Sequence, residues 1–229
     1  MKKIVFLLTL LLAGTSLSAQ DFEPKDSWAY IYEDFNEGVV MTRKGETLLQ
    51  SRINVSVVNG RLHYLRDGKI MEADMLQVYT VKIKDDRFLN VSGKLLRILS
   101  QSEHAAVLEG VEVDLDKLSK AEIGYGITSS TASTQSLSVA ALQGIITGTQ
   151  SNLDYVTARE GKTSGERLPI LRVKYIFTKG SLVEARKREV VKLPFLDRKV
   201  AEAFFKQEKI KWSKIEDLQK VADYVAAQQ

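Results

Sequence analysis

Two histidines and a few acidic side chains are the residues of this sequence whose chemistry could serve catalysis or metal binding. His63 and Glu72 fall opposite each other on neighbouring expected strands, and an imidazole beside a carboxylate can titrate near neutral pH. His104 lies in a polar stretch, and two histidines with one glutamate would form a minimal zinc set. No HExxH or comparable spacing supports that set. We therefore favour an ordinary cross-strand pair for His63 and Glu72, and expect neither a metal nor another cofactor.

A row of carboxylates follows between residues 109 and 116. Glu112, Asp114 and Asp116 would share one face of a strand, because strand side chains alternate between faces. Such a row could hold a cation or supply half of a glycosidase pair, but a solvated strand face is the favoured interpretation. The sequence has no GxSxG motif, no Walker lysine and no cysteine. The nucleophile and nucleotide-binding classes with those signatures are therefore excluded.

Three aromatic residues alternate near the N-terminus, namely Trp28, Tyr30 and Tyr32. This spacing is typical of an edge strand or of an N-terminal arm packed on a sheet. An aromatic platform that binds sugar is the alternative interpretation, and these three residues are its candidate binding side chains.

The elements that would position these residues are mainly strands. Residues 20–116 form an expected antiparallel β-rich region, in which Asn59-Gly60 and Asp67-Gly68 have the composition of two-residue type I′ turns. Two such turns place Val55 opposite Tyr64 and Tyr64 opposite Met71. The resulting meander has one apolar face and one more polar face. Its arrangement is expected to be a sandwich or a rolled sheet.

The remaining chain divides into two further regions. Residues 117–167 are rich in Ser, Thr, Gly and Ala, with one short helix expected. Residues 168–229 predict a β-hairpin across Lys179-Gly180, with strands Leu168–Thr178 and Leu182–Val191, followed by two helices. Asp197 is expected to cap the first helix, and Ser213 with Glu216 forms a capping-box pattern for the second. The predicted fold class is α+β.

The first 19 residues have the layout of a secretory signal peptide. Two lysines precede the ten-residue apolar run Ile4–Ala13, and small residues lead to cleavage after Ala19, or alternatively after Ser18. Without cysteine the exported chain cannot be a lipoprotein, and no later stretch is long enough for an integral membrane helix. Nucleic acid is not an expected partner of an exported chain.

Charge is unevenly distributed along the chain. Residues 20–166 carry 16 basic and 21 acidic side chains, whereas residues 167–229 carry 15 and 8. The basic C-terminal part could meet lipopolysaccharide or another polyanion. We favour the simpler interpretation that oppositely charged parts pack together or that lysine-rich helix faces are solvated.

Two segments carry a resemblance to known proteins. Residues 29–74, with Asn54, Gly60, Leu62 and Tyr64 in a recurrent spacing, resemble an element of uncharacterised secreted proteins of Bacteroidetes. The ending FFKQEKIKWSKIEDLQKVADYV is similar to a helical ending in the same group. The resemblance implies a periplasmic or outer-membrane-associated protein, and it brings no activity and no catalytic residues.

These observations lead to three functional expectations. The first is an exported, non-enzymatic envelope protein that binds or helps to assemble another envelope component, either a protein or a glycan. It predicts an exposed apolar or aromatic patch. The alternative is a hydrolase that acts on envelope polysaccharide or peptide through paired carboxylates or through His63 and Glu72. The third is a structural protein that packs against copies of itself.

Overall fold

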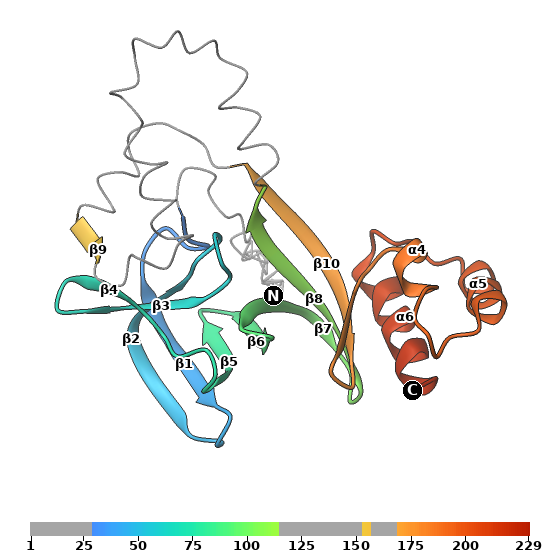
Figure 1. Cartoon of the computed structure of the whole chain (residues 1–229), viewed down its shortest axis with the longest axis horizontal. Helices are drawn as coiled ribbons and strands as arrows, with labels where there is room; N and C mark the ends of the chain where they lie inside the picture. The colour runs from blue at the N-terminus through green and yellow to red at the C-terminus, as the bar shows by residue number, and fades with distance from the viewer. Residues whose placement is uncertain (1–28, 115–152, 157–168) are drawn as a thin grey trace, which may run out of the picture.

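The computed structural model describes residues 29–114, 153–156 and 169–229 (Figure 1). The expected signal peptide and nearly all of region 117–167 lie outside these residues. The described strands form one antiparallel sheet of 11 strands, in the order β11-β10-β8-β7-β6-β5-β1-β2-β3-β4-β9. Their bounds are β1 Asn36–Thr42, β2 Thr47–Val55, β3 Leu62–Arg66, β4 Lys69–Glu72, β5 Val78–Ile83, β6 Asp86–Val91, β7 Lys94–Gln101, β8 Ala105–Val113, β9 Leu153–Asp154, β10 Ile170–Thr178 and β11 Ser181–Glu184.

Strands β1 to β8 curl around a common core. The amide of Val113, at the end of β8, donates to the carbonyl of Val57 at 3.1 Å, and the amide of Leu95 donates to Gly60 at 2.7 Å. These bonds join β7 and β8 to the turn that follows β2, so the sheet closes into a roll. Its core is apolar and draws on seven strands, with members that include Val40, Ile53, Val55, Leu62, Val81, Ile83, Phe88, Leu95 and Val111.

The turns at Asn59-Gly60 and Asp67-Gly68 differ in structure. Asp67 and Gly68 both have positive φ, 50° and 75°, as a type I′ turn requires. The register across this turn pairs His63 with Glu72 and Tyr64 with Met71, as predicted.

The predicted register across Asn59-Gly60 is wrong by two residues, because Val55 pairs with Leu62 rather than with Tyr64. The turn is wider than two residues: the Ser56 amide donates to Arg61, and the Gly60 amide donates to Ser56. A shift of two preserves the alternation of faces, so Val55 and Tyr64 still face the core.

Strands β7, β8, β10 and β11 continue beyond the roll as a ribbon whose far end carries the helices (Figure 1). The helices are α4 Lys187–Val190, α5 Arg198–Gln207 and α6 Ile215–Ala227. They enclose a second core with β8 and β10, which includes Val107, Ile176, Val190, Ala201, Phe205, Leu218, Val221 and Val225. The antiparallel sheet with C-terminal helices agrees with the predicted α+β class. Among the described helices, none has both the length and the apolar character needed to cross a bilayer.

Three local details of the C-terminal region are now defined. Asp197 caps α5 as predicted, because its carboxylate accepts from the amides of Lys199 and Val200. The expected strand Leu182–Val191 ends early, since β11 stops at Glu184 and α4 follows. The capping box at Ser213 does not form: Lys214 occupies the N-cap of α6 and makes no side-chain cap bond.

Candidate functional site

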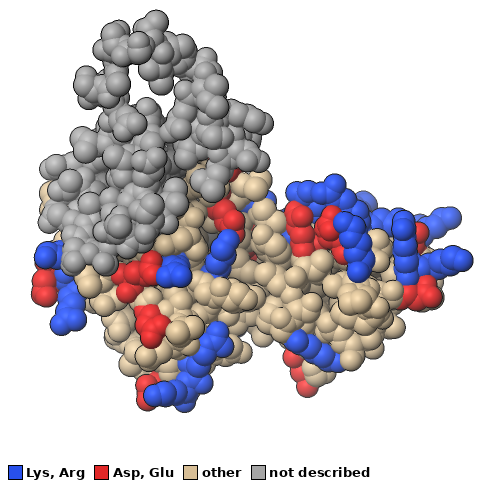
Figure 2. All heavy atoms as spheres, in the orientation of Figure 1, with Lys and Arg blue, Asp and Glu red and all other residues tan. Residues whose placement is uncertain are grey.

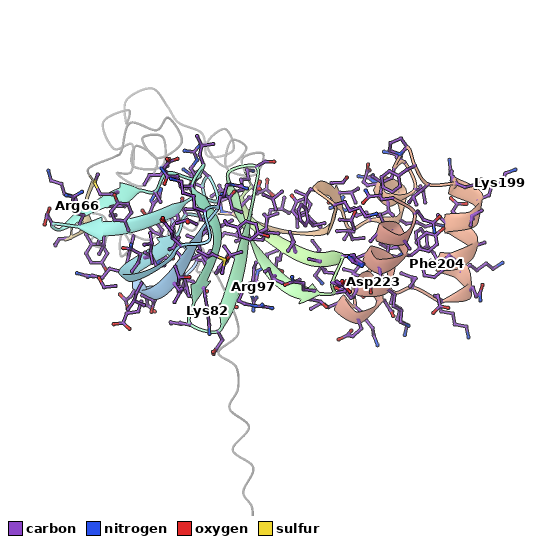
Figure 3. The ribbon with its side chains drawn as sticks, turned by 90° about the horizontal axis from the view of Figure 1, so that it is seen from below. Arg66, Lys82, Arg97, Lys199, Phe204 and Asp223 are labelled. Atoms are coloured by element: carbon purple, nitrogen blue, oxygen red, sulfur yellow. The ribbon has the colours of Figure 1, made fainter. Side chains whose placement is uncertain are left out.

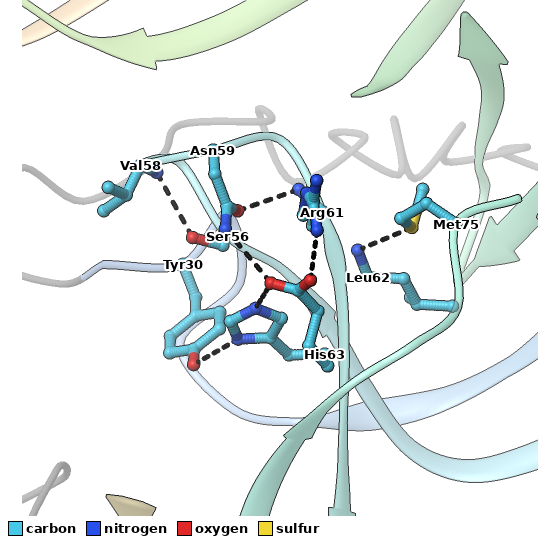
Figure 4. Close-up of polar contacts among 9 residues, drawn as sticks. Tyr30, Ser56, Val58, Asn59, Arg61, Leu62, His63 and Met75 are labelled. Carbon is cyan, nitrogen blue, oxygen red and sulfur yellow. Dashed lines mark hydrogen bonds and ion pairs between the residues drawn. The ribbon is translucent and has the colours of Figure 1, made fainter. Parts of the chain in front are cut away.

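His63 lies on the outer face of β3, under the segment that precedes β1. Tyr30 forms an antiparallel bridge with Ser56, and the Ile31 amide donates to Val55 at 2.9 Å. This segment therefore runs along β2 and covers His63, which is only 7% exposed. The hydroxyl of Tyr30 lies 2.8 Å from His63 Nδ1 (Figure 4). The predicted polar sheet face is thus a covered interface at this point.

Glu72 completes this cluster from β4. Its carboxylate lies 3.5 Å from His63 Nε2, forms a close ion pair with Arg61 and accepts from the side-chain Nδ2 of Asn59 at 3.3 Å. Burial lowers the pKa of His63, and this effect outweighs the opposing influence of Glu72. Burial disfavours the charged form of Tyr30 as well, and for a phenol this raises the pKa.

Burial limits the chemistry of the cluster formed by Tyr30, His63 and Glu72, because it restricts the access of a substrate to the imidazole. His63 and Tyr30 are both below 10% exposed, so a substrate cannot reach the imidazole. The surrounding contacts are apolar and aromatic: the Tyr30 ring meets Phe35 edge-on at 5.0 Å, and Phe35 meets Tyr155 at 5.5 Å. Arg52 stacks over the Tyr155 ring. The cluster therefore fastens residues 29–35 and Tyr155 to the sheet.

Of the three N-terminal aromatic residues, Tyr30 and Tyr32 are described, and neither is exposed as a platform residue would be. Tyr30 is 3% exposed, and Tyr32 is half-buried, with its hydroxyl 2.6 Å from an oxygen of Asp86. Burial and this hydrogen bond raise the pKa of Tyr32. Trp28 lies outside the described residues. The sugar-binding interpretation therefore has no support from the placement of Tyr30 and Tyr32.

A second polar cluster was missed by sequence reasoning. Arg97 on β7 makes an ion pair of 2.7 Å with Asp86 and one of 3.6 Å with Glu109 on β8. Glu109 is 7% exposed, and Arg97 lies between the roll and the helical end of the molecule (Figure 3). The register of β6, β7 and β8 places the three charges on one face. The Ser92-Gly93 turn, in which both residues have positive φ, was the local signal that could have fixed the pairing of β6 with β7.

The predicted row of carboxylates is divided between environments. Glu112 faces outward and pairs with Lys94 at 2.8 Å, whereas Glu109 faces inward to Arg97. Asp116 lies outside the described residues. Throughout residues 29–114, 153–156 and 169–229, no three His, Cys, Asp or Glu side chains are grouped as a metal site would require.

Exposed apolar side chains occur at the end of the roll that carries the β1–β2 hairpin. The tip of this hairpin lies at the bottom of the view in Figure 1, apart from the helices at the right. We call the exposed apolar side chains around this end the hairpin-tip patch, and they are Met41, Leu48, Leu49, Leu76 and Tyr79. Leu48 lies opposite Val40 and Leu49 opposite Val39, so these two leucines extend from opposite faces of the sheet. Leu49 is 78% exposed and Leu76 is 84% exposed. The Arg43 amide donates to the carbonyl of Gln77 at 2.8 Å, so the chain around Leu76 runs beside the β1–β2 hairpin.

Comparison with known proteins adds no functional assignment. No protein-family model matches the sequence, and no curated protein or solved structure matches it significantly. The resemblance to secreted Bacteroidetes proteins therefore stays a prediction, and the functional argument rests on the geometry described above.

Proposed function

We propose that this chain is an exported, non-enzymatic envelope protein that binds or helps to assemble another envelope component through the hairpin-tip patch. The observation that carries the proposal is the exposure of Leu49 and Leu76. Several large apolar side chains exposed near one hairpin are a feature of interaction surfaces. Burial of each leucine would contribute about 1.5–3 kcal/mol, enough for a few such residues to anchor a partner.

The chemistry of the patch favours a protein partner over a glycan. Met41, Leu48 and Leu49 offer aliphatic surface with no hydrogen-bonding group, whereas a glycan presents hydroxyl groups that would have to be satisfied. Arg43 and Lys44 occupy the tip of the same hairpin, and both are exposed. An apolar centre beside charged groups is the usual anatomy of a protein interface.

Export to the periplasm, the outer membrane or the extracellular space is part of this proposal, and residues 1–19 support it. N-terminal sequencing of the protein from the envelope fraction should give a chain that begins at Gln20. A protein that keeps Met1 and stays in the cytoplasmic fraction would contradict export without affecting the proposal for the patch.

The rival hydrolase proposal is less well supported. A glycosidase pair needs two carboxylates that differ in proton affinity and flank a substrate. Of the carboxylates expected to supply such a pair, Glu112 is paired with Lys94, and Asp116 lies outside the described residues. A second group of close carboxylates, Asp86 and Glu109, shares Arg97. His63 is shielded from solvent, so the second catalytic arrangement lacks access.

The proposal is tested by affinity capture from envelope extracts with the tagged mature protein. We expect one stoichiometric partner with the wild type, and its loss with the double variant Leu49→Glu, Leu76→Glu. Val200→Glu is the matched control, because Val200 is also apolar and 56% exposed but lies on α5. Recovery of the same partner by the double variant would refute the role of the patch. Altered glycan or peptide fragments in place of a partner would favour the hydrolase.

A further inference from the structure

An open cavity of about 440 Å³ lies at the surface of the helical end of the molecule, remote from the hairpin-tip patch (Figure 1). It is bounded by α4, by α5 and by the chain that follows α5. Its walls combine apolar and charged residues, the main ones being Phe205, Ile210, Trp212, Lys187, Lys206 and Glu202.

The floor of the cavity is produced by the way α5 ends. Lys209 adopts a left-handed conformation with φ of 50°, and the Ile210 amide donates back to the carbonyl of Phe205 at 3.0 Å. This reversal returns the chain along α5. The Trp212 ring consequently meets the Phe205 ring edge-on, with centroids 5.2 Å apart, and the two rings form an aromatic floor.

The rim of the cavity is cationic. Neither Lys187 nor Lys206 has an ion-pair partner within the described part of the chain, and both are exposed. The acidic residue of the rim, Glu202, is already engaged by Arg198 at 3.2 Å. Figure 2 shows Lys and Arg side chains over the helices with Asp and Glu side chains among them. Residues 167–229 carry 15 basic and 8 acidic side chains, so the net charge of this region favours an anion.

We propose that this cavity binds a small amphipathic carboxylate, whose apolar part lies on Phe205, Ile210 and Trp212 and whose charged group lies between Lys187 and Lys206. The aromatic floor selects an apolar group, and two lysines without carboxylate partners select a negative charge over a neutral or positive one. An extended polyanion would use the lysines but leave the floor unoccupied. The site is separate from the hairpin-tip patch and does not rest on the proposed function.

The test uses Trp212 as the reporter. The chain has two tryptophans, so Trp28→Phe leaves Trp212 as the single source of tryptophan fluorescence. Octanoate is titrated against this protein, with 1-octanol and octylammonium as neutral and cationic counterparts. We expect a saturable change with octanoate, at least about fivefold tighter than with either counterpart, as two exposed charge contacts would give.

Charge variants then locate the anion. Lys187→Gln with Lys206→Gln should weaken octanoate binding about fivefold and leave 1-octanol binding unchanged. Lys199→Gln is the matched control, since Lys199 is an exposed lysine of α5 outside the cavity lining (Figure 3). The chemical shift of the Trp212 indole N–H provides a second readout. Absence of saturable octanoate binding, or equal weakening by Lys199→Gln, would overturn the proposal.

Discussion

At the scale of single residues, the side chains most capable of acid–base chemistry have structural roles in this fold. His63 and Tyr30 join the segment before β1 to β3 through a contact of 2.8 Å. Glu72 keeps Arg61 beside the same imidazole. A buried polar group must have such partners, because an unsatisfied one costs about 1–3 kcal/mol. Reactive residue types alone are therefore weak indicators of a catalytic site in this protein.

The lowered pKa of His63 makes the stability of the fold dependent on pH. In the unfolded chain histidine titrates near pH 6.5, whereas the buried native imidazole binds a proton less readily. Below pH 6.5 the unfolded state therefore binds more protons, and the free energy of unfolding falls as the pH is lowered. We expect His63→Gln to reduce this fall between pH 7.5 and 5.5 in urea denaturation.

The second histidine provides the control for this prediction. His104 has a side chain that is 68% exposed, and His104→Gln should retain the pH dependence of the wild type. A wild-type slope in His63→Gln would show that other groups, such as the carboxylates, account for the loss of stability in acid.

At the scale of elements, helix starts show which local signals survive in the fold. Asp197 begins α5 with two hydrogen bonds from its carboxylate, at 2.8 and 3.0 Å. Ser213 has an equally suggestive sequence context, but α6 begins one residue later. Asp217, in the first turn of α6, instead accepts from the amide of Lys211 at 3.0 Å. The chain that enters α6 is held by this contact rather than by a capping box.

The two helix starts should respond differently to the same kind of substitution. Asp197→Ala removes a formed cap and should lower the free energy of unfolding by about 1 kcal/mol. Ser213→Ala removes no cap bond and should change it by less than about 0.5 kcal/mol. Equilibrium urea denaturation of both variants measures the difference. Equal effects would mean that Ser213 caps α6 in solution.

At the scale of the whole molecule, β8 belongs to both hydrophobic cores. Val111 and Val113 lie in the core of the roll, whereas Ala105 and Val107 lie in the core under the helices. Glu109 lies between them, paired with Arg97. The turn before β8 also meets the helices, because Ser102 donates to Asp223 of α6 at 2.6 Å. Because β8 contributes residues to both cores, the roll and the helical end are linked through this one strand.

This coupling predicts one cooperative unfolding transition. Phe88→Ala in the roll and Leu218→Ala in α6 each remove a fully buried side chain, and each should lower stability by about 3 kcal/mol. Both variants should shift the same transition, because half of β8 cannot stay folded when the other half unfolds. The measurement compares Trp212 fluorescence, in a Trp28→Phe background, with far-UV circular dichroism during urea unfolding.

Separate behaviour of the two ends would contradict this prediction. If Phe88→Ala left the fluorescence transition of Trp212 unchanged while the circular dichroism transition moved, the helical end would unfold independently. Val200→Ala provides a reference for small effects, since Val200 is 56% exposed.

Local patterns in the sequence were sufficient to predict several features of the fold. Alternating apolar residues predicted the antiparallel sheet, the Asp67-Gly68 dipeptide predicted its turn and register, and Asp197 predicted a helix start. Each of these depends on neighbours within a few residues, for which backbone sterics and capping bonds are decisive. The export signal and the envelope role were also read from sequence, and they stay predictions.

Only the tertiary structure decided which residues meet across long distances. Asp86, Arg97 and Glu109 meet because β6, β7 and β8 are paired in register, and Tyr32 joins them from the segment before β1. Trp212 reaches Phe205 because the chain reverses at Lys209. The sequence by itself determined the kinds of elements and the faces of the strands, since both follow from side-chain periodicity. Closure of the roll and burial of His63 depend on contacts between distant segments. These contacts determine which polar groups are buried in the fold, and they leave the hairpin-tip patch and the lysine-rimmed cavity exposed to solvent.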